Sequence, residues 1–457
     1  MFSCDMIALG RDFFACKHNL LGKNSDRPLG EAQPLAFFPS AVYTPGTLLR
    51  CTHLTVPQAE RTYAVLGSKP FWIWGFEMGA NECGVFIGNE AQGSRCVAET
   101  EDGMLGMDML RIALERAATA RDAIYVIAAL LTQYGQNANA NLLFDRRYEN
   151  SYMIVDRQEI WLMETAGREW VAKLVSDWTA ISNCYSIGTD YDLCSREVER
   201  HARENRWLAQ NEPFDFARTY TAPAPRQTYS IPRRRRLQQL IREHDGALDY
   251  KAVKRLFRDH FEGDFLAPQY GACYGGFVSV CMHAMTWDVS QTAASLICSY
   301  DEQLGIVCRY APSLPCCSVF IPVYWTGVLP AVMKTGGESY DAASLWWVTE
   351  RLAMAISVDE KRFGLPARTA LQTLEEQIEK NAQQAENQAR SLLTEHKVVE
   401  ANAVLNSVTE HAAKEMLELA SRLSNEICSI VHEEGGAYGL RKEFLIAYSN
   451  RVKMPLF

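Results

Sequence analysis

The stretch Met1-Phe2-Ser3-Cys4-Asp5-Met6-Ile7-Ala8-Leu9 places a cysteine directly before an apolar run that predicts a strand. Loss of Met1–Ser3 would leave Cys4 with a free α-amino group beside its thiol. The ordinary pKa values, about 8 for the amine and about 8.5 for the thiol, lie near neutrality. Cys4 would then carry both a nucleophile and a base. The alternative is a small buried cysteine near a chain end.

The composition is that of a globular protein with one large or two moderate domains: 457 residues, 48% hydrophobic and 22% charged. The net charge of −9 argues against a nucleic-acid partner. We expect no membrane association, because no leader is visible and no run approaches the ~20 apolar residues of a membrane helix. The 14 cysteines are scattered, which predicts reduced thiols and a cytoplasmic location.

The chain has few cysteine and histidine residues at the spacing typical of metal ligands. Cys281 and His283 are one close pair of cysteine and histidine, and there is no Cys-x-x-Cys motif. Two ligands are too few for a structural zinc site, so the sequence predicts neither a metal nor an organic cofactor.

Short apolar or aromatic runs, separated by turn residues, predict many strands. These lie at residues 51–56, 62–66, 71–76, 84–87, 152–155, 159–163, 170–174, 179–181, 277–282, 294–300 and 305–310. Helical periodicity predicts helices at 105–114, 120–134, 195–209, 233–243 and 250–257. Antiparallel strands with helices inserted in blocks indicate an α+β layered sandwich.

The chain changes character at about Thr369, where Glu, Gln, Ala and Lys dominate. Two apolar stripes with helical spacing predict a long helical hairpin over 365–434, followed by a tail at 435–457. The stripes are Leu371, Leu374, Ile378, Ala382, Ala385 and Ala389, and Val404, Val408, Ala412, Leu419, Leu423, Ile427 and Ile430. Packing against the parent domain is the main interpretation, and a homo-oligomer through these helices is the alternative.

A second polar segment, Gly22–Pro28, follows Cys4 by about twenty residues, which suits a strand, a turn and a returning strand. Asp26 could therefore lie beside Cys4 and hold its amino group. The same segment also suits a turn with a salt bridge.

Further motifs continue this series in order along the chain. They are Asn81–Ala91, Leu105–Asp108 with Ala113–Arg116, Trp161–Gly167, Ile181–Asn183, Cys281–His283 and Pro315–Ser318. Together with Ser3–Asp5 and Gly22–Pro28, the set resembles the secernins and the related bacterial dipeptidases, a family of N-terminal-nucleophile cysteine hydrolases. The similarity spans about residues 3–325, and the helical tail resembles that of the bacterial dipeptidases.

The resemblance implies a four-layer αββα fold and cleavage of the Ser3–Cys4 bond by the chain itself. Residues 1–3 would be a propeptide and 4–360 the catalytic domain. Cys4 would attack amides through a thioester, with its own α-amine as base. The resemblance further implies that Asp26 orients the amine and that Asn183 stabilises the oxyanion, with Asn89 as a second candidate.

Four adjacent arginines, Arg233–Arg236, would open a helix, where cations are unfavourable. The wider family, with penicillin and bile-salt amidases, carries an Arg-x-x-Arg-x-x-x-Leu helix that Arg233, Arg236 and Leu240 match. This implies an electrostatic role for Arg233 in the pocket. Those amidases have arginine where this chain has Lys23, which keeps the charge but loses the bidentate fork.

Lys23, Glu90 and His283 are assigned to the substrate side of the site, with a purely structural histidine as the other interpretation of His283. The sequence thus predicts a dipeptidase that cleaves small peptides. One alternative is an amidase or acyltransferase acting on an N-acyl amino acid or a specialised metabolite. The other is a secernin-like regulatory or binding protein without catalysis.

Overall fold

The computed structural model describes residues 3–96, 103–223, 229–264, 279–284, 286–287, 289–436, 439 and 441–456. The chain forms two compact units. The N-terminal unit contains residues 2–23 and 38–249, and the C-terminal unit contains 24–37 and 250–457. The boundary falls inside strand β2 (Leu20–Arg27), whose first half belongs to the N-terminal unit and whose second half belongs to the C-terminal unit.

The N-terminal unit is built on two sheets. β1 (Cys4–Leu9) pairs antiparallel with β14 (Trp178–Ser182), with Asp5 opposite Ser182. The larger sheet has the strand order β15-β13-β12-β11-β10-β9-β8 within this unit. Its strands are β8 (Val65–Ser68), β9 (Met78–Asn81), β10 (Phe86–Gln92), β11 (Glu149–Val155), β12 (Ile160–Ala166), β13 (Glu169–Leu174) and β15 (Leu193–Cys194).

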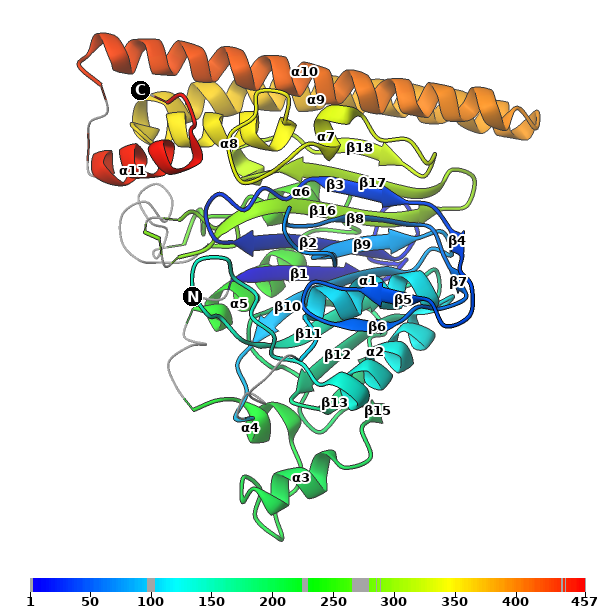
Figure 1. Ribbon diagram of the computed structural model, residues 1–457. Coiled ribbons are helices and arrows are strands. Elements are labelled where there is room, and N and C mark those ends of the chain that lie inside the picture. Colours follow the sequence, from blue (N-terminus) through cyan, green and yellow to red (C-terminus); the bar gives the residue numbers. More distant parts are fainter. Residues whose placement is uncertain are drawn as a thin grey trace. The chain divides into compact units, whose positions relative to one another are not determined.

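Helices cover the outer faces of these sheets (Figure 1). α1 (Gly106–Arg116) and α2 (Ala120–Tyr134) pack on the larger sheet, α5 (Ser230–Glu243) packs on β14 and β1, and β1 packs on β10 and β11. Every residue of β10, β11 and β12 is buried, as expected for strands between two layers. The order helix, sheet, sheet, helix confirms the predicted α+β class and its four layers.

Shorter elements complete this unit. They are β4 (Ala41–Val42) paired with β7 (Arg61–Thr62), β5 (Leu48–Arg50) paired with β6 (Thr55–Pro57), and the helices α3 (Val198–Glu204) and α4 (Phe216–Tyr220). β3 (Leu35–Phe38) lies at the second boundary between the units.

The C-terminal unit places the second half of β2 next to β16 (Gln291–Asp301), followed by β17 (Gly305–Pro312) and β18 (Ile321–Tyr324). The hairpin helices α9 (Glu360–Thr394) and α10 (Val398–Glu433) run side by side (Figure 1), and α8 (Leu345–Ile356) packs against both. The remaining helices are α6 (Tyr250–Phe257), η2 (Pro315–Cys317), α7 (Ala331–Lys334) and α11 (Lys442–Val452).

Most helix predictions hold. The predicted bounds of α2 and α6 agree with the structure, and α5 begins three residues earlier than expected, at Ser230. The Oγ of Thr119 caps α2 by accepting a hydrogen bond from the backbone N of Asp122 (3.1 Å). The helix expected over 195–209 is shorter, because only Val198–Glu204 is helical.

The strand predicted at residues 71–76 is wrong. The backbone N of Trp74 donates to Thr52 Oγ1 (2.9 Å), and that of Gly75 donates to Asp108 Oδ1 (2.9 Å). Side chains therefore take the donors that a strand ladder would need. Of the strand predicted at 277–282, residues 277 and 278 lie outside the described part, and 279–282 are not a strand.

The predicted stripe on α9 is buried at Leu371, Ile378, Ala382 and Ala389. On α10 the buried line is rotated, since Leu405 and Met416 are buried whereas Val404 and Val408 are only half-buried. The thirteen cysteines among the described residues are free thiols. No helix in the described ranges has the length and apolar character needed to cross a bilayer.

Candidate active site

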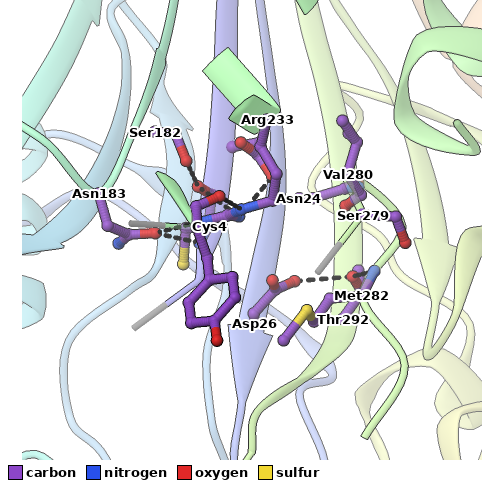
Figure 2. A network of polar contacts seen from close by, with 12 residues as sticks. Cys4, Asn24, Asp26, Ser182, Asn183, Arg233, Ser279, Val280, Met282 and Thr292 are labelled. Atoms are coloured by element: carbon purple, nitrogen blue, oxygen red, sulfur yellow. Dashed lines mark hydrogen bonds and ion pairs between the residues drawn. The ribbon is translucent and has the colours of Figure 1, made fainter. Parts of the chain in front are cut away.

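Cys4 is the first residue of β1 and is buried, with 6% of its surface exposed. Its backbone N donates to Asn183 Oδ1 (2.7 Å). Its carbonyl oxygen accepts hydrogen bonds from Arg233 Nη1 (3.3 Å) and Ser182 Oγ (3.3 Å). Figure 2 shows these groups converging on the main chain of Cys4. The backbone on both sides of its α-carbon is thus held in place.

Arg233 is a fully buried cation in the first turn of α5. Its Nη1 forms an ion pair with Asp5 Oδ2 (2.7 Å), and its Nη2 donates to Asn183 Oδ1 (2.9 Å). A charge in this position requires a partner, and the carboxylate of Asp5 also offsets the unfavourable end of the helix dipole. Arg234, in contrast, donates to the carbonyl oxygen of Tyr185 (3.4 Å). The arginine chosen from the sequence is therefore one that contacts Cys4.

The orientation of the Asn183 amide follows from its neighbours. Oδ1 accepts from two donors, the backbone N of Cys4 and Nη2 of Arg233, while Nδ2 donates to the carbonyl oxygen of Ala91 (2.8 Å). A flipped amide would place donors against donors and an acceptor against an acceptor. Asn183 therefore presents its oxygen to the nitrogen of Cys4, and the oxyanion-donor role predicted from the sequence stays a prediction.

Lys23 and Asn89 lie in a second buried network. Lys23 Nζ donates to Glu77 O (2.8 Å), Glu77 Oε2 (2.9 Å) and Asn89 Oδ1 (3.2 Å). These three contacts use all three hydrogens of an ammonium group. Asn89 Nδ2 donates to Asn150 Oδ1 (3.0 Å). This geometry favours a role for Lys23 in joining β2 to β10 and to Glu77, the residue before β9, over a direct contact with substrate.

Two further glutamates are buried in the N-terminal unit. Glu90 is buried in β10, opposite Ser151 of β11. Glu164 accepts hydrogen bonds from the backbone N and Oγ of Ser186 and the backbone N of Ile187, at 2.8–3.0 Å. Burial nevertheless raises the pKa of Glu164 to about 7, against the opposing effect of these hydrogen bonds.

Asp26 and His283 belong to the C-terminal unit. Asp26 is buried, and its Oδ1 accepts from Thr292 Oγ1 (2.7 Å), as Figure 2 shows. His283 Nε2 lies 3.3 Å from Cys316 Sγ and 3.1 Å from His260 Nε2. The roles predicted for Asp26 and His283 toward Cys4 and the substrate stay predictions.

One atom each of His260, Cys281, His283 and Cys316 lies within 4.8 Å of the others, and all four residues are buried. Only Cys281 and His283 of these potential metal ligands are close in the sequence. His260 and Cys316 are 23 and 33 positions from His283, too far to be grouped with it by spacing alone.

Sequence reasoning also missed Asp5, Ser182 and Glu77 as parts of the site networks. Two of them lay inside quoted motifs: Asp5 follows Cys4, and Ser182 precedes Asn183. The signal that could have found them is the β1–β14 register, which places Asp5 opposite Ser182. Glu77 lies outside the quoted motifs, and only the fold brings it to Lys23.

The model of peptidase family C69 matches residues 53–368, which include Asn89, Asn183, Arg233 and His283 and begin after Cys4. A curated relative from Bifidobacterium longum, named "Dipeptidase", is 25% identical over 294 residues, covering 54% of this chain and 52% of the relative. The chain thus matches about half the length of that relative.

Among solved structures, two variants of a conjugated bile acid hydrolase from Clostridium perfringens match with 11% and 12% identity and TM-scores of 0.40 and 0.41. They cover 74% and 73% of this chain and 95% of their own chains. An N-acylethanolamine-hydrolyzing acid amidase ortholog from Caenorhabditis elegans matches with 8% identity and a TM-score of 0.32. The match covers 64% of this chain and 92% of the ortholog. The family model spans well over half of the sequence, and on that match the chain belongs to peptidase family C69.

Proposed function

We propose that this chain is a cysteine amide hydrolase that cleaves small peptides, with Cys4 as the nucleophile. The observation that carries the proposal is the anchoring of the Cys4 backbone by Asn183, Arg233 and Ser182. A nucleophile needs a fixed position relative to the attacked carbonyl. These contacts hold the nitrogen and the carbonyl of Cys4 from two sides.

The first step of the proposal is cleavage of the Ser3–Cys4 bond. The thiolate of Cys4 attacks the carbonyl carbon of Ser3, the C–N bond breaks, and the acyl group passes to sulphur while the nitrogen takes up a proton. Water then hydrolyses the thioester and releases the segment that ends at Ser3. Cys4 keeps a free α-amine.

In the processed enzyme, the amine would keep Asn183 Oδ1 as its acceptor, at the place where the amide N of Cys4 donates (2.7 Å). One amine hydrogen is then fixed, which leaves two tetrahedral positions for the nitrogen lone pair. The amine removes the thiol proton and later protonates the leaving amine of the substrate.

Charge on the substrate oxygen requires a donor. The Nδ2 group of Asn183 has two hydrogens, of which one bonds to Ala91 O, so an oxyanion role would use the other. Asn89 is the second candidate for the oxyanion donor. Asp26 is a second candidate, besides Asn183, for the group that holds the α-amine of Cys4. Glu90 is a candidate for contact with a substrate amine.

The proposal assigns residues 4–360 to the catalytic domain, 365–434 to a helical extension and 435–457 to a tail. Small peptides are proposed as substrates because the family is one of peptidases and the matching relative from Bifidobacterium longum is named a dipeptidase. A cytoplasmic location and self-association through α9 and α10 are parts of the same proposal.

Intact mass of the purified protein tests the processing step. We expect a chain that begins at Cys4 for the wild type and an uncleaved Ser3–Cys4 bond for Cys4→Ala. A dipeptide panel, with and without added amine acceptors, tests the reaction. Free amino acids indicate hydrolysis, and new amides indicate an acyltransferase. Unprocessed wild type with no turnover would overturn the proposal in favour of a binding protein.

A further inference from the structure

The four-residue cluster His260, Cys281, His283 and Cys316 in the C-terminal unit, called here the Cys2His2 cluster, contains the ligand set of a structural zinc site. His260 Nε2 lies 3.1 Å from His283 Nε2, which in turn lies 3.7 Å from Cys281 Sγ and 3.3 Å from Cys316 Sγ. Tetrahedral zinc, with Zn–N about 2.0–2.1 Å and Zn–S about 2.3 Å, separates neighbouring ligand atoms by about 3.3–3.8 Å. We propose that the Cys2His2 cluster binds one zinc ion.

A second observation concerns the other nitrogen of His260. Its Nδ1 lies 2.9 Å from Glu262 Oε1. Histidines that bind metal through one nitrogen commonly donate the other N–H to a carboxylate, which fixes the tautomer and turns the free lone pair toward the metal. Glu262 Oε2 also accepts from the backbone N of His260 (2.7 Å), so the carboxylate holds both ends of the residue.

The backbone around the Cys2His2 cluster is joined independently of any ion. Cys281 N donates to the carbonyl oxygen of Asp259 (3.1 Å), next to His260. Arg258 donates to the carbonyl oxygens of Pro315 (2.7 Å) and Ser318 (3.0 Å), on either side of Cys316. Three separate segments are therefore brought together by bonds that do not involve the ligand atoms. Such preorganisation is what a selective metal site requires.

Charge balance supports zinc at this buried position. Two thiolates and two neutral imidazoles carry a charge of about −2, which a divalent cation cancels. Buried charge is tolerated only when it is compensated. A set of two sulphur and two nitrogen ligands favours zinc over magnesium or calcium, which prefer oxygen.

The Cys2His2 cluster has a structural link to Asp26, within the same unit. Met282 lies between two of the ligands, and its backbone N donates to Thr292 Oγ1 (2.9 Å), which in turn donates to Asp26 Oδ1 (2.7 Å; Figure 2). Bound zinc would therefore hold the segment that supports Thr292 and, through it, Asp26.

Metal analysis of the full chain, purified without an affinity metal or chelator, tests the proposal. We expect about one zinc per chain, and for the cobalt-substituted protein the intense visible bands of tetrahedral thiolate coordination. Cys316→Ser and His260→Ala should lose the metal, whereas His260→Cys, which restores a ligand, should keep it. Cys308→Ser is the matched control, because Cys308 is a buried thiol 3.2 Å from Cys298 Sγ and lies outside the cluster.

Glu262→Gln provides a variant that keeps all four ligands. It should bind zinc about 10–100-fold more weakly in competition with a chromogenic chelator. Wild type that contains no zinc and takes up neither zinc nor cobalt would overturn the proposal, as would equal metal loss in Cys308→Ser and Cys316→Ser. Iron in place of zinc would also overturn it. Metal content does not depend on turnover, so this outcome is separate from the proposed function.

Discussion

Two buried cysteines differ in whether the surrounding groups contact the backbone or the sulphur atom. Around Cys4, the contacts described above fall on the backbone: Asn183 binds its nitrogen, and Arg233 and Ser182 bind its carbonyl oxygen. Around Cys316, the described contacts are made to the sulphur atom, which lies 3.3 Å from His283 Nε2. Anchoring the main chain positions a thiol for attack on another molecule, whereas surrounding the sulphur with nitrogen and sulphur atoms suits a metal ligand.

Replacement of Cys4 is the test with the largest expected effect on the difference between the two cysteines. Cys4→Ala should reduce peptide hydrolysis by about 10⁴-fold or more, because the thioester cannot form. Its zinc content should equal that of the wild type. Hydrolysis by Cys4→Ala at the wild-type rate would remove the contrast, since Cys4 would then be one more structural thiol.

Arg233→Met tests the anchor itself. The substitution leaves the buried carboxylate of Asp5 without its guanidinium, which should lower the free energy of unfolding by about 3–5 kcal/mol. Denaturant unfolding measures the loss. The double variant Arg233→Met with Asp5→Asn should recover part of it, and a double variant as unstable as the single one would contradict the pairing.

The variants Asn183→Ala and Asn89→Ala test which of the two asparagines is the oxyanion donor. Loss of the true donor should reduce kcat by about 10²–10³-fold. Asn183→Ala should also slow cleavage of the Ser3–Cys4 bond, because Asn183 contacts the nitrogen of that bond. Equal processing in both variants, measured by intact mass, would argue that Asn183 does not position Cys4.

Glu164 gives an effect of a different kind, a change of stability with pH. Burial raises its pKa from 4.5 to about 7 in the folded chain, so the folded state holds a proton that the unfolded state has lost. The contribution of Glu164 to stability is therefore fully present below pH 4.5 and declines up to about pH 7. Denaturant unfolding of wild type and Glu164→Gln should show this decline only in the wild type. Parallel profiles would contradict the raised pKa.

The motif order was enough to predict the layered fold and to bring Cys4, Asn183 and Arg233 together. It could not predict the direction of the Asn183 amide, because that depends on the carbonyl oxygen of Ala91. Side-chain identity does not report where a backbone oxygen from another strand will lie.

The Cys2His2 cluster shows the same limit at longer range. Cys281 and His283 are adjacent enough to be noticed in the sequence, but His260 and Cys316 join them only after α6, β16 and β17 have packed. The strand wrongly expected at 71–76 failed for a related reason, since Thr52 and Asp108 take its backbone donors. A local sequence pattern indicates the secondary structure that a segment favours. Contacts with residues distant in the sequence determine the structure that the segment adopts.

The division of β2 between the units has a consequence for how the chain is made. Residues 24–37 leave the ribosome long before residues 250–457, with which they share a unit, whereas the N-terminal unit is fully synthesised at residue 249. The second half of β2, Asn24–Arg27, belongs to the C-terminal unit and pairs with β16 only after β16 is made, and such distant pairing slows folding. A fragment that starts at Tyr250 would lack this strand, so cutting the gene there would not yield an autonomous half.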